Sequence, residues 1–236
     1  MSMPFYVSPE QLMKDRADYA RKGISRGRPV IAASSQDGIL FVTVNPASTL
    51  YKTSELYDRI GFAAVGKYNE FESLRVAGIR YADLRGFSYN RSDVNARGLA
   101  NTYAQTLGAV FTTESKPLEV ELVVAQVNAQ VQDDEFYRLS FDGSVAQERN
   151  FVVMGAQAEA IHTGLEQQWD PDLTLGELLG VSVQVLSQVG QAGVGPDAAP
   201  EAGVLEVSLL RRTAPRRAFE RLSTLEISQL LQAGSK

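Results

Sequence analysis

The sequence predicts an α+β protein built as a four-layer αββα sandwich, in which two antiparallel sheets face each other and a pair of helices covers each sheet. Three observations support this fold class. Strand-like segments follow one another in blocks, Asp-Gly turns join two of the strand pairs, and the helical segments also come in pairs. Strands that alternated singly with helices would instead predict a parallel sheet. The sandwich gives every amphipathic face a partner, so we expect one domain over residues 1–236.

The first predicted element is a helix that begins at Pro9 and runs to about Lys22. Ser8 supplies the cap, proline occupies the first helical position and Gln11 the third, which is the capping-box pattern. Glu10 adds an acidic side chain where the helix dipole favours one. Apolar side chains then recur at helical spacing, so the expected helix is short and amphipathic.

The remaining elements follow from hydrophobic period and turn chemistry. Ser92 is expected to cap the second helix of the first pair. The segment Gly190–Gly203 is rich in Gly, Ala and Pro and is expected to form a flexible surface loop. Strands are predicted at Val30–Ser35, Ile39–Val44, Leu50–Thr53, Arg59–Val65, Val120–Val127, Phe136–Phe141, Val145–Glu148, Phe151–Met154 and Val204–Leu210, and helices at Phe71–Leu84, Ala96–Val110, Ala156–Gln168, Leu175–Val189 and Leu225–Leu231.

Composition argues against several classes of function. The chain has no cysteine and one histidine, His162, which leaves no Cys-based metal or nucleophile site and no pair for a metal cage or a serine–histidine relay. A net charge of −5 argues against a broad nucleic-acid surface. No run approaches the ~18 apolar residues of a membrane span. The opening MSMPFYVSPEQ lacks the features of a signal peptide, so we expect a cytoplasmic protein without a metal or cofactor.

A few conspicuous side chains have ordinary structural interpretations. His162 and Trp169 lie on or just beyond a predicted helix and are interpreted as packing or surface residues. A basic cluster surrounds Pro215, and the acidic balance of the whole chain favours a solvated loop or a subunit contact there. The cluster consists of Arg211, Arg212, Arg216 and Arg217.

The segment GFAAVGKY, Gly61–Tyr68, is one residue short of a phosphate-binding loop. Such a loop needs a buried strand before it, a flexible cradle, and a small hydroxyl side chain after the lysine. Here Ser54–Arg59 is too charged for a buried parallel strand, Phe62–Val65 fills the loop interior, and Tyr68 replaces the hydroxyl residue. Nucleotide binding is therefore not expected, and the segment is interpreted as a strand, a turn and the start of a helix.

Six short motifs within the first 110 residues carry a family resemblance. They are Tyr6 with Ser8–Gln11, Tyr19–Gly23, Leu50–Lys52, Glu55–Arg59, Gly66–Phe71 and Ala104–Gly108. Together these motifs resemble the α subunits of actinobacterial proteasomes, and the similarity spans nearly the whole chain, weakest around 131–135 and 187–203. The resemblance implies the N-terminal-nucleophile hydrolase fold, which is the same four-layer sandwich that the sequence pattern predicts.

Resemblance to the α type also implies a subunit without catalysis of its own. Catalytic β-type relatives expose an N-terminal threonine at the start of the first strand, where the free amine and a nearby lysine activate its hydroxyl. Here that place reads Arg26–Val30, and the predicted first helix occupies the path of a free amino terminus. Thr112 and Thr113 follow a helix and have no Gly-Thr processing junction, so they are assigned to a helix end.

The resemblance further implies a ring of seven copies at each end of a β-subunit chamber, with a central pore through which unfolded protein substrates pass. The first seven residues are too short to fold alone and carry apolar side chains, and seven such tails could pack at the ring axis as a gate. The turn that follows would be the hinge of the gate. The gate residues are Met1, Ser2, Met3, Pro4, Phe5, Tyr6 and Val7, and the hinge residues are Ser8, Pro9, Glu10 and Gln11.

Lys52 is the residue that the resemblance assigns to activator binding. Its ammonium group would lie in the cleft between neighbouring subunits and meet the C-terminal carboxylate of an activator tail. Gly66 and Lys67 would line the same pocket, Gly66 because it lets a foreign backbone approach. The implied partners are the proteasome β subunit, a hexameric ATPase ring that unfolds tagged proteins, and an ATP-independent activator ring; no nucleic acid or membrane partner is implied.

Two alternatives stay open at the level of the sequence. A self-processing N-terminal-nucleophile amidohydrolase would share the fold and would expose its nucleophile at a newly formed amino terminus. A stand-alone binding domain would share the fold without assembling into a ring.

Overall fold

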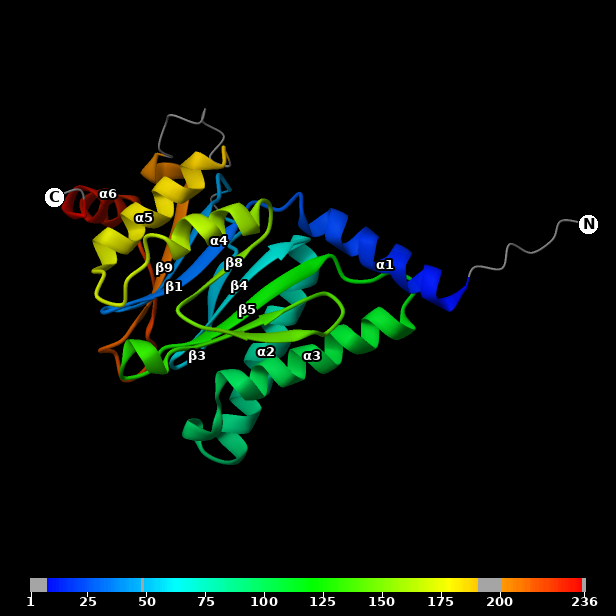
Figure 1. Ribbon diagram of the computed structural model, residues 1–236. Helices are drawn as coiled ribbons and strands as arrows, with labels where there is room; N and C mark the ends of the chain where they lie inside the picture. Colours follow the sequence, from blue (N-terminus) through cyan, green and yellow to red (C-terminus); the bar gives the residue numbers. More distant parts are fainter. Residues whose placement is uncertain (1–7, 48, 191–200, 235–236) are drawn as a thin grey trace, which may run out of the picture.

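Two five-stranded antiparallel sheets face each other in the computed structural model, which describes residues 8–47, 49–190 and 201–234 (Figure 1). The first sheet has the strand order β10-β9-β2-β1-β8 and the second has the order β3-β4-β5-β6-β7. The strands of the first sheet are β1 (Val30–Ser35), β2 (Gly38–Val44), β8 (Phe151–Met154), β9 (Leu205–Arg211) and β10 (Phe219–Arg221). Those of the second are β3 (Thr53–Tyr57), β4 (Ile60–Gly66), β5 (Val120–Gln126), β6 (Glu135–Leu139) and β7 (Val145–Glu148).

Helices cover the outer face of each sheet, which confirms the predicted αββα sandwich. α2 and α3 lie against the second sheet, and α4, α5 and α6 lie against the first (Figure 1). α1 precedes β1 and projects from one end of the sandwich. The helices are α1 (Pro9–Ile24), α2 (Tyr68–Ser88), α3 (Ala96–Thr113), α4 (Ala158–Glu166), α5 (Leu175–Gln188) and α6 (Thr224–Ala233), with 3₁₀ turns at Arg91–Asp93, Val131–Asp133 and Ala202–Val204.

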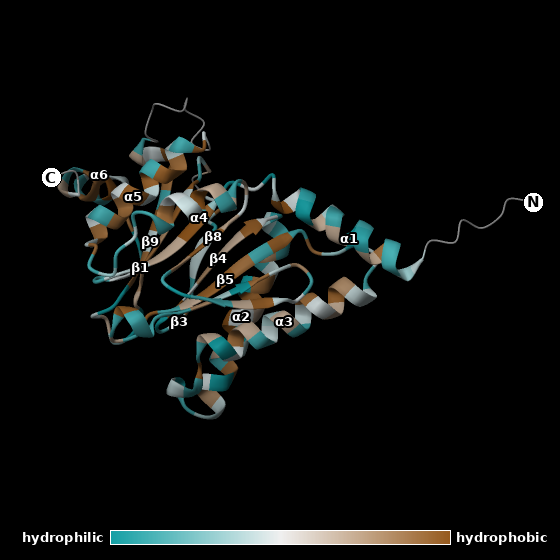
Figure 2. Cartoon of the chain, in the orientation of Figure 1, coloured by the Kyte–Doolittle hydropathy of each residue, from teal (hydrophilic) through white to brown (hydrophobic). Residues whose placement is uncertain are grey.

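Three apolar layers hold the sandwich together, and β1 shows how one strand serves two of them. Successive side chains of a strand point to opposite faces. Val30 and Ala32 therefore pack between the sheets, whereas Ile31 and Ala33 pack beneath the helices of the first sheet. All six residues of β1 are buried, and Figure 2 shows the same hydrophobic character along the central strands. A strand buried on both faces reads as a continuous apolar run rather than an alternating one.

The hairpin of β1 and β2 confirms the predicted Asp-Gly turn. Ser35 pairs with Gly38 at the end of the ladder. Gly38 has φ +148°, and a side chain there would collide with the carbonyl of Leu210 on β9. Only glycine combines this conformation with such close contact to a neighbouring strand.

The prediction for the strand after residue 49 is wrong in position. Leu50–Thr53 was expected to be extended, but β3 spans Thr53–Tyr57 and includes most of the charged segment that precedes GFAAVGKY. β3 is an edge strand that combines buried residues, such as Leu56, with partly exposed ones, such as Glu55. The charge argument applies to a central strand buried on both faces and not to an edge strand.

Other departures concern ends and short elements. Asn95, not Ser92, caps α3, because its side chain accepts a hydrogen bond of 2.8 Å from the backbone nitrogen of Gly98. Ser92 lies in a separate 3₁₀ turn. β10 has only three residues and was not predicted.

The interpretation of GFAAVGKY as strand, turn and helix is confirmed, because β4 ends at Gly66 and α2 begins two residues later.

One arginine of the basic cluster is buried, which corrects the interpretation of that cluster as a solvated loop or subunit contact. The Arg212 guanidinium pairs with Asp134 at 2.8 Å, and the two side chains are 10% and 1% exposed. Arg212 also donates to the carbonyl of Ser35. The other three arginines of the cluster are exposed.

The assignment of His162 and Trp169 as packing or surface residues is confirmed. His162 packs its ring 4.9 Å from that of Phe151. The indole nitrogen of Trp169 donates to the carbonyl of Ser34 at 3.0 Å. Within the described residues, none of the helices combines the length and the apolar character that crossing a membrane requires.

Two helix glycines should respond in opposite ways to alanine. A Cβ on Gly78 of α2 would collide with the buried hydroxyl of Tyr103, whereas a Cβ on Gly180 of α5 would meet no atom within 4 Å beyond its own helix backbone and chain neighbours. Gly78→Ala should lower the free energy of unfolding by about 1–3 kcal/mol through overpacking. Gly180→Ala should raise it by about 0.5–1 kcal/mol, because alanine loses less backbone entropy in a helix. Urea unfolding measures both shifts, and shifts of the same sign would contradict the packing argument.

Candidate functional site

The start of β1 is the place where catalytic relatives would carry their nucleophile. Here Arg28 and Pro29 stand directly before the strand, and α1 ends only a few residues earlier. The carbonyl of Pro29 accepts a 2.7 Å hydrogen bond from the hydroxyl of Thr43. The carbonyl of Arg28 accepts a 2.9 Å hydrogen bond from the ammonium group of Lys52. The chain therefore places a lysine, without a terminal threonine, at the head of its first strand.

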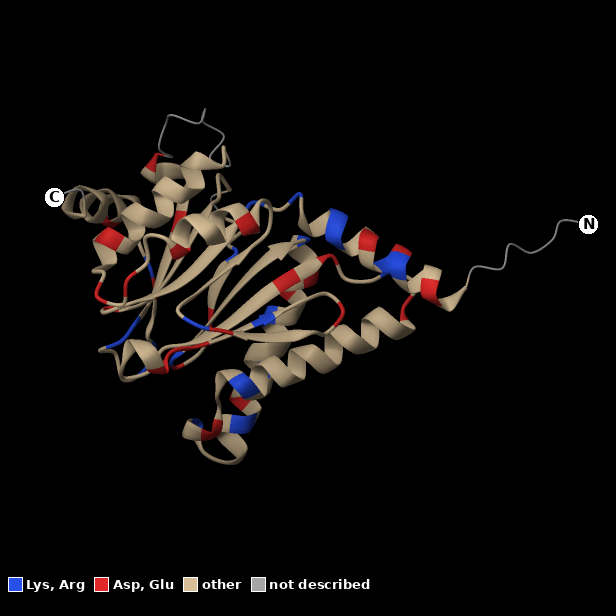
Figure 3. Ribbon diagram, viewed as in Figure 1, with Lys and Arg blue, Asp and Glu red and all other residues tan. Residues whose placement is uncertain are grey.

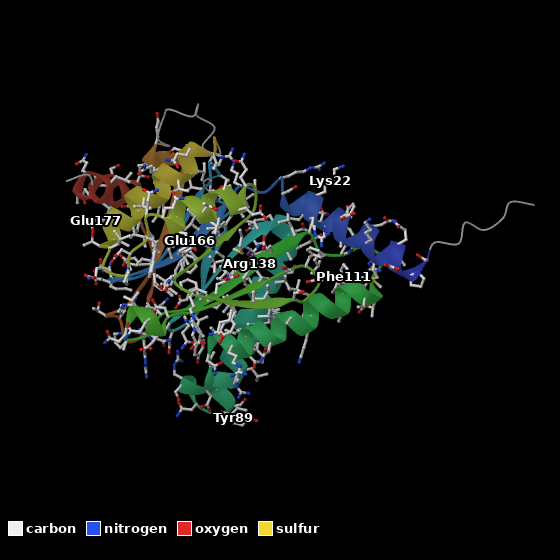
Figure 4. The ribbon with its side chains drawn as sticks, in the orientation of Figure 1. Lys22, Tyr89, Phe111, Arg138, Glu166 and Glu177 are labelled. Atoms are coloured by element: carbon white, nitrogen blue, oxygen red, sulfur yellow. The ribbon has the colours of Figure 1, made fainter. Side chains whose placement is uncertain are left out.

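Thr112 and Thr113 belong to the last turn of α3, as predicted. Their hydroxyls donate to backbone carbonyls of the same helix, Thr112 to Gly108 at 2.9 Å and Thr113 to Ala109 at 2.7 Å. Figure 4 labels the neighbouring Phe111 near the end of α3 that approaches α1. The guanidinium of Arg16 lies 5.6 Å from the Phe111 ring and links the two helices.

The structure brings Lys52, Gly66 and Lys67 to one end of the two sheets. The carbonyl of Lys52 accepts a 3.1 Å hydrogen bond from the backbone nitrogen of Ala64, two residues before Gly66. A Cβ on Gly27, next to Arg28, would lie 3.2 Å from the backbone nitrogen of Gly66. The loop before β1, the start of β3 and the end of β4 therefore meet at this place.

Gly66 has a conformational reason to be glycine that the sequence did not reveal. Its φ is +110°, and a side chain would collide with the carbonyl of Glu119. The backbone that approaches Gly66 is thus a segment of the same chain. The neighbouring Lys67 donates its backbone nitrogen to the same carbonyl at 2.9 Å. The turn between β4 and α2 is fixed from within the subunit.

Lys67 carries a positive charge at the turn between β4 and α2. It is the N-cap of α2, and its side chain is 51% exposed, with the ammonium 3.8 Å from the Glu70 carboxylate. The positive end of the α2 dipole lies at the same place. A lysine and a helix amino terminus therefore meet at this turn, with the Glu70 carboxylate beside them.

Burial lowers the pKa of Lys52 from 10.5 to about 8, while the nearby Glu206 carboxylate raises it and Arg28 lowers it further. Folding therefore disfavours the charged ammonium. This cost to stability is fully present below about pH 8 and disappears as the pH rises through the unfolded value of 10.5. At neutral pH most Lys52 side chains are charged and can bind a carboxylate.

Sequence reasoning missed the residues that hold Lys52. Glu206 of β9 accepts hydrogen bonds from the backbone nitrogens of Lys52 and Thr53, 154 and 153 positions away. Arg221 donates to the carbonyl of Thr53 at 2.8 Å and stacks on Tyr51, with 3.7 Å from the guanidinium carbon to the ring centre. The only available signal was an acidic residue inside the apolar run LEVSLL.

A cavity of about 670 Å³ lies beside the same segment and is separate from the Lys52 ammonium. Tyr51 and Thr53 contribute to its lining, whereas Lys52 does not. Charged side chains of both signs surround it, among them Glu55, Arg75 and Arg221.

The predicted gate, residues 1–7, lies outside the described residues, but the predicted hinge is visible. Ser8 caps α1 by accepting a 3.2 Å hydrogen bond from the backbone nitrogen of Gln11. The Gln11 amide reaches forward to Asp15 at 2.6 Å, and Pro9 and Glu10 occupy the first turn as predicted. Acidic and basic residues alternate along this helix (Figure 3).

The hinge is not beside Lys52 within one chain. α1 has 16 residues, so its ends are about 24 Å apart at 1.5 Å per residue. The carboxyl end, at Ile24, lies near the head of β1, and the Ser8 end projects away from the sandwich (Figure 1). Within a subunit, the whole helix separates the hinge from Lys52, Gly66 and Lys67, the residues of the predicted lysine pocket.

Two facing antiparallel sheets between layers of helices, with a helix in place of a free terminal nucleophile, define a protein of the N-terminal-nucleophile hydrolase fold. Comparison with known families narrows this class. The family model described as proteasome subunit matches residues 24–196, and the chain belongs to the proteasome subunit family.

Similar proteins identify the type within the family. The chain is 64% identical to the proteasome subunit alpha of Sanguibacter keddieii, over 98% of this chain and 90% of that relative. It is 62% identical to the Xylanimonas cellulosilytica protein of the same description, over 94% and 93%. It is 60% identical to that of Kineococcus radiotolerans, over 98% of each chain. The predicted resemblance is confirmed, and the chain is of the α type, a non-catalytic component of the proteasome.

Lys52 should titrate near pH 8 in the folded protein, because partial burial removes water from its ammonium group. The rate of its acetylation, followed by peptide mass spectrometry, should rise with pH and level off soon after pH 8. Lys22, exposed on α1 and labelled in Figure 4, controls for reagent reactivity. A Lys52 rate that continues to rise to pH 10.5 would show that burial does not lower the pKa.

Proposed function

We propose that this chain forms the heptameric end rings of a proteasome core, where it gates substrate access to the proteolytic chamber and binds the tails of activators. Its α type implies assembly with β subunits in the core particle. The observation that carries the proposal is the partly buried Lys52 ammonium, at the same end of the sandwich as the Gly66–Lys67 turn. The single-domain organisation and a cytoplasmic location belong to the same proposal.

The chemistry at Lys52 suits the C-terminal carboxylate of a peptide tail. An ammonium group has three donors, and one of them is engaged by the carbonyl of Arg28. A charge-assisted hydrogen bond to an incoming carboxylate contributes about 1.5–3 kcal/mol, which is weak for a single tail. Several tails on one activator ring would add avidity, so a modest contact at each subunit suffices.

Glu119 lies between the Gly66–Lys67 turn and α1 and would couple the two. Glu119 lies behind the Gly66–Lys67 turn, and a side chain on Gly23 of α1 would collide with its carboxylate. The Lys116 ammonium forms salt bridges to the carboxylates of Glu119, at 2.9 Å, and Glu70, at 2.8 Å. An activator tail that binds a shifted position of the Gly66–Lys67 turn more tightly than its resting position would move α1. A tail that binds both positions of the turn equally would leave α1 in place.

The gate itself is the segment before α1. Residues 1–7 include Met1, Met3, Phe5 and Val7, whose apolar side chains favour burial over exposure to water. Around the axis of a ring, seven such segments can bury one another and close the pore. Release of α1 at the Ser8 turn would separate them. The implied activators are a hexameric ATPase ring and an ATP-independent ring, and the implied substrates are unfolded proteins.

Deletion of residues 1–7 tests the gate. In the assembled core particle, the truncated subunit should raise peptide hydrolysis without an activator several-fold, because the plug is gone. The measurement is hydrolysis of a short fluorogenic peptide, with particle assembly checked by native mass spectrometry. Basal hydrolysis equal to that of the full-length particle would rule out the gate assignment.

Substitution of Lys52 tests activator binding. Lys52→Ala should abolish stimulation of the assembled particle by an activator ring, because the tail carboxylate loses its partner. Lys22→Ala removes an exposed lysine of α1 and should leave stimulation unchanged. In the unsubstituted particle, stimulation should weaken as the pH rises above about 8, since a neutral Lys52 amine attracts the carboxylate less. Full stimulation of the Lys52→Ala particle would refute this role.

A further inference from the structure

A buried carboxylate occupies the seam between the two sheets beside Lys52. Glu206 belongs to β9 of the first sheet, and its side chain crosses to the start of β3 in the second sheet. The residue is only 6% exposed. A carboxylate so deeply buried is stable only if donors surround it. The described residues around Glu206 supply them.

Four donor groups converge on the Glu206 carboxylate. The backbone nitrogen of Lys52 lies 3.0 and 3.1 Å from its two oxygens. The backbone nitrogen and hydroxyl of Thr53 donate to Oε1 at 2.8 and 2.6 Å. The side-chain amide of Asn45 donates to Oε2 at 2.6 Å. Every one of these donors lies at an end of the segment that connects β2 to β3.

The same segment is closed on itself by Asn45. Its amide nitrogen also donates to the carbonyl of Leu50 at 2.8 Å, and its side-chain oxygen accepts from the backbone nitrogen of Ala47 at 3.1 Å. Ser208, two residues after Glu206 on β9, shares a 2.8 Å hydrogen bond with the hydroxyl of Thr53. The position of Lys52 is therefore set from β9 and not by β3 alone.

The acceptor must be a carboxylate to satisfy this arrangement. An ionised carboxylate has acceptor sites only, whereas the amide of glutamine presents two donors on one of its ends. Whichever way a glutamine pointed, its NH₂ group would face the donors of Thr53 or Asn45. A buried mismatch of this kind leaves polar groups unsatisfied and loosens the segment.

Fixing the backbone of Lys52 also fixes the direction of its side chain. The nitrogen of Lys52 is bound by Glu206 and its carbonyl by Ala64, so the side chain leaves a peptide unit held on both sides. The ammonium then reaches the carbonyl of Arg28 at 2.9 Å. The Glu206 charge favours the charged form of the same lysine.

We propose that Glu206 is the positioning residue of the Lys52 site: its carboxylate holds the Lys52–Thr53 backbone so that the ammonium is presented to the carboxylate of a bound peptide. The identity of the ligand in this inference rests on the proposed function, whereas the effect of Glu206 on the position and charge of Lys52 does not. A loss of Glu206 should therefore alter Lys52 in the absence of any activator.

The experiment compares Glu206→Gln with the unsubstituted subunit in the assembled core particle. The first readout is the pH profile of Lys52 acetylation, which should shift to lower pH in the variant because a nearby negative charge is lost.

The second readout is the binding of a labelled peptide, measured by fluorescence anisotropy. The peptide carries the last eight residues of the cognate ATPase and is made with a free carboxylate and with a C-terminal amide. The unsubstituted particle should prefer the carboxylate form by about tenfold, which corresponds to one charge-assisted hydrogen bond. Glu206→Gln should reduce this preference to about twofold or less and leave amide binding unchanged.

Matched variants separate positioning from stability. Asp134→Asn replaces another buried carboxylate, at the Arg212 ion pair, and should leave the carboxylate preference intact. Thr53→Val removes one donor to Glu206 but keeps the carboxylate, and should reduce the preference less than Glu206→Gln does. Thr53→Ser keeps the hydroxyl and should show the same carboxylate preference as the unsubstituted particle. If Glu206→Gln does not assemble, the two Thr53 variants still test the inference, and equal preferences in them would overturn it.

The two proposals fail in different ways. If the unsubstituted particle binds the carboxylate and amide peptides equally, the assignment of Lys52 to activator tails is wrong, and the inference about its ligand fails with it. A shift in the Lys52 acetylation profile would then still support the structural role of Glu206. If Glu206→Gln changes neither the acetylation profile nor the carboxylate preference, the positioning role is overturned while the proposed function stands.

Discussion

The packing of two sheets face to face is the constraint on which the rest of this molecule depends. Each sheet has two faces to bury, and the inner faces bury each other, as Val30 and Ala32 of β1 do with Ala63 and Val65 of β4. The outer faces then require helices, which the pairs after β4 and β8 supply. α1 contributes Ala20 and Ile24 to the central layer but stands outside the four layers along most of its length (Figure 1). Only its carboxyl-terminal part is anchored in the core, so its amino-terminal end is suited to carry a moving segment.

The same packing encloses two carboxylates at the ends of the seam, and both find partners there. At one end Glu206 is surrounded by donors from the β2–β3 connection. At the other end Asp134 accepts from Arg212 and from the hydroxyl of Ser34. Buried charges of this kind are costly unless fully paired, so each one pins several loops at once. Glu206 holds the backbone of the lysine pocket. The geometry of the pocket can therefore be fixed although its residues come from loops and strand ends.

Sequence reasoning succeeded where local signals and the core agreed. The β1–β2 hairpin, the strand–turn–helix reading of GFAAVGKY and the serine cap of α1 all follow from short-range patterns, and the structure contains them. It failed at β3, where an edge strand leaves Glu55 partly exposed and needs no buried partner for its charge. It also failed at Arg212, because a guanidinium is buried only when a partner such as Asp134 comes to meet it from 78 positions away. No local pattern reports such a partner.

By itself, the sequence determined the layer architecture, the start of α1, and the family, which the comparisons place among proteasome subunits. These properties follow from hydrophobic periodicity, from turn and cap residues and from short motifs, all of which are local in the sequence. Only the tertiary structure decided what surrounds Lys52: the carbonyl of Arg28, the carboxylate of Glu206 and the turn at Gly66. Those contacts join segments far apart in the chain, and they exist because two sheets close on one another and leave buried polar groups to satisfy across the seam.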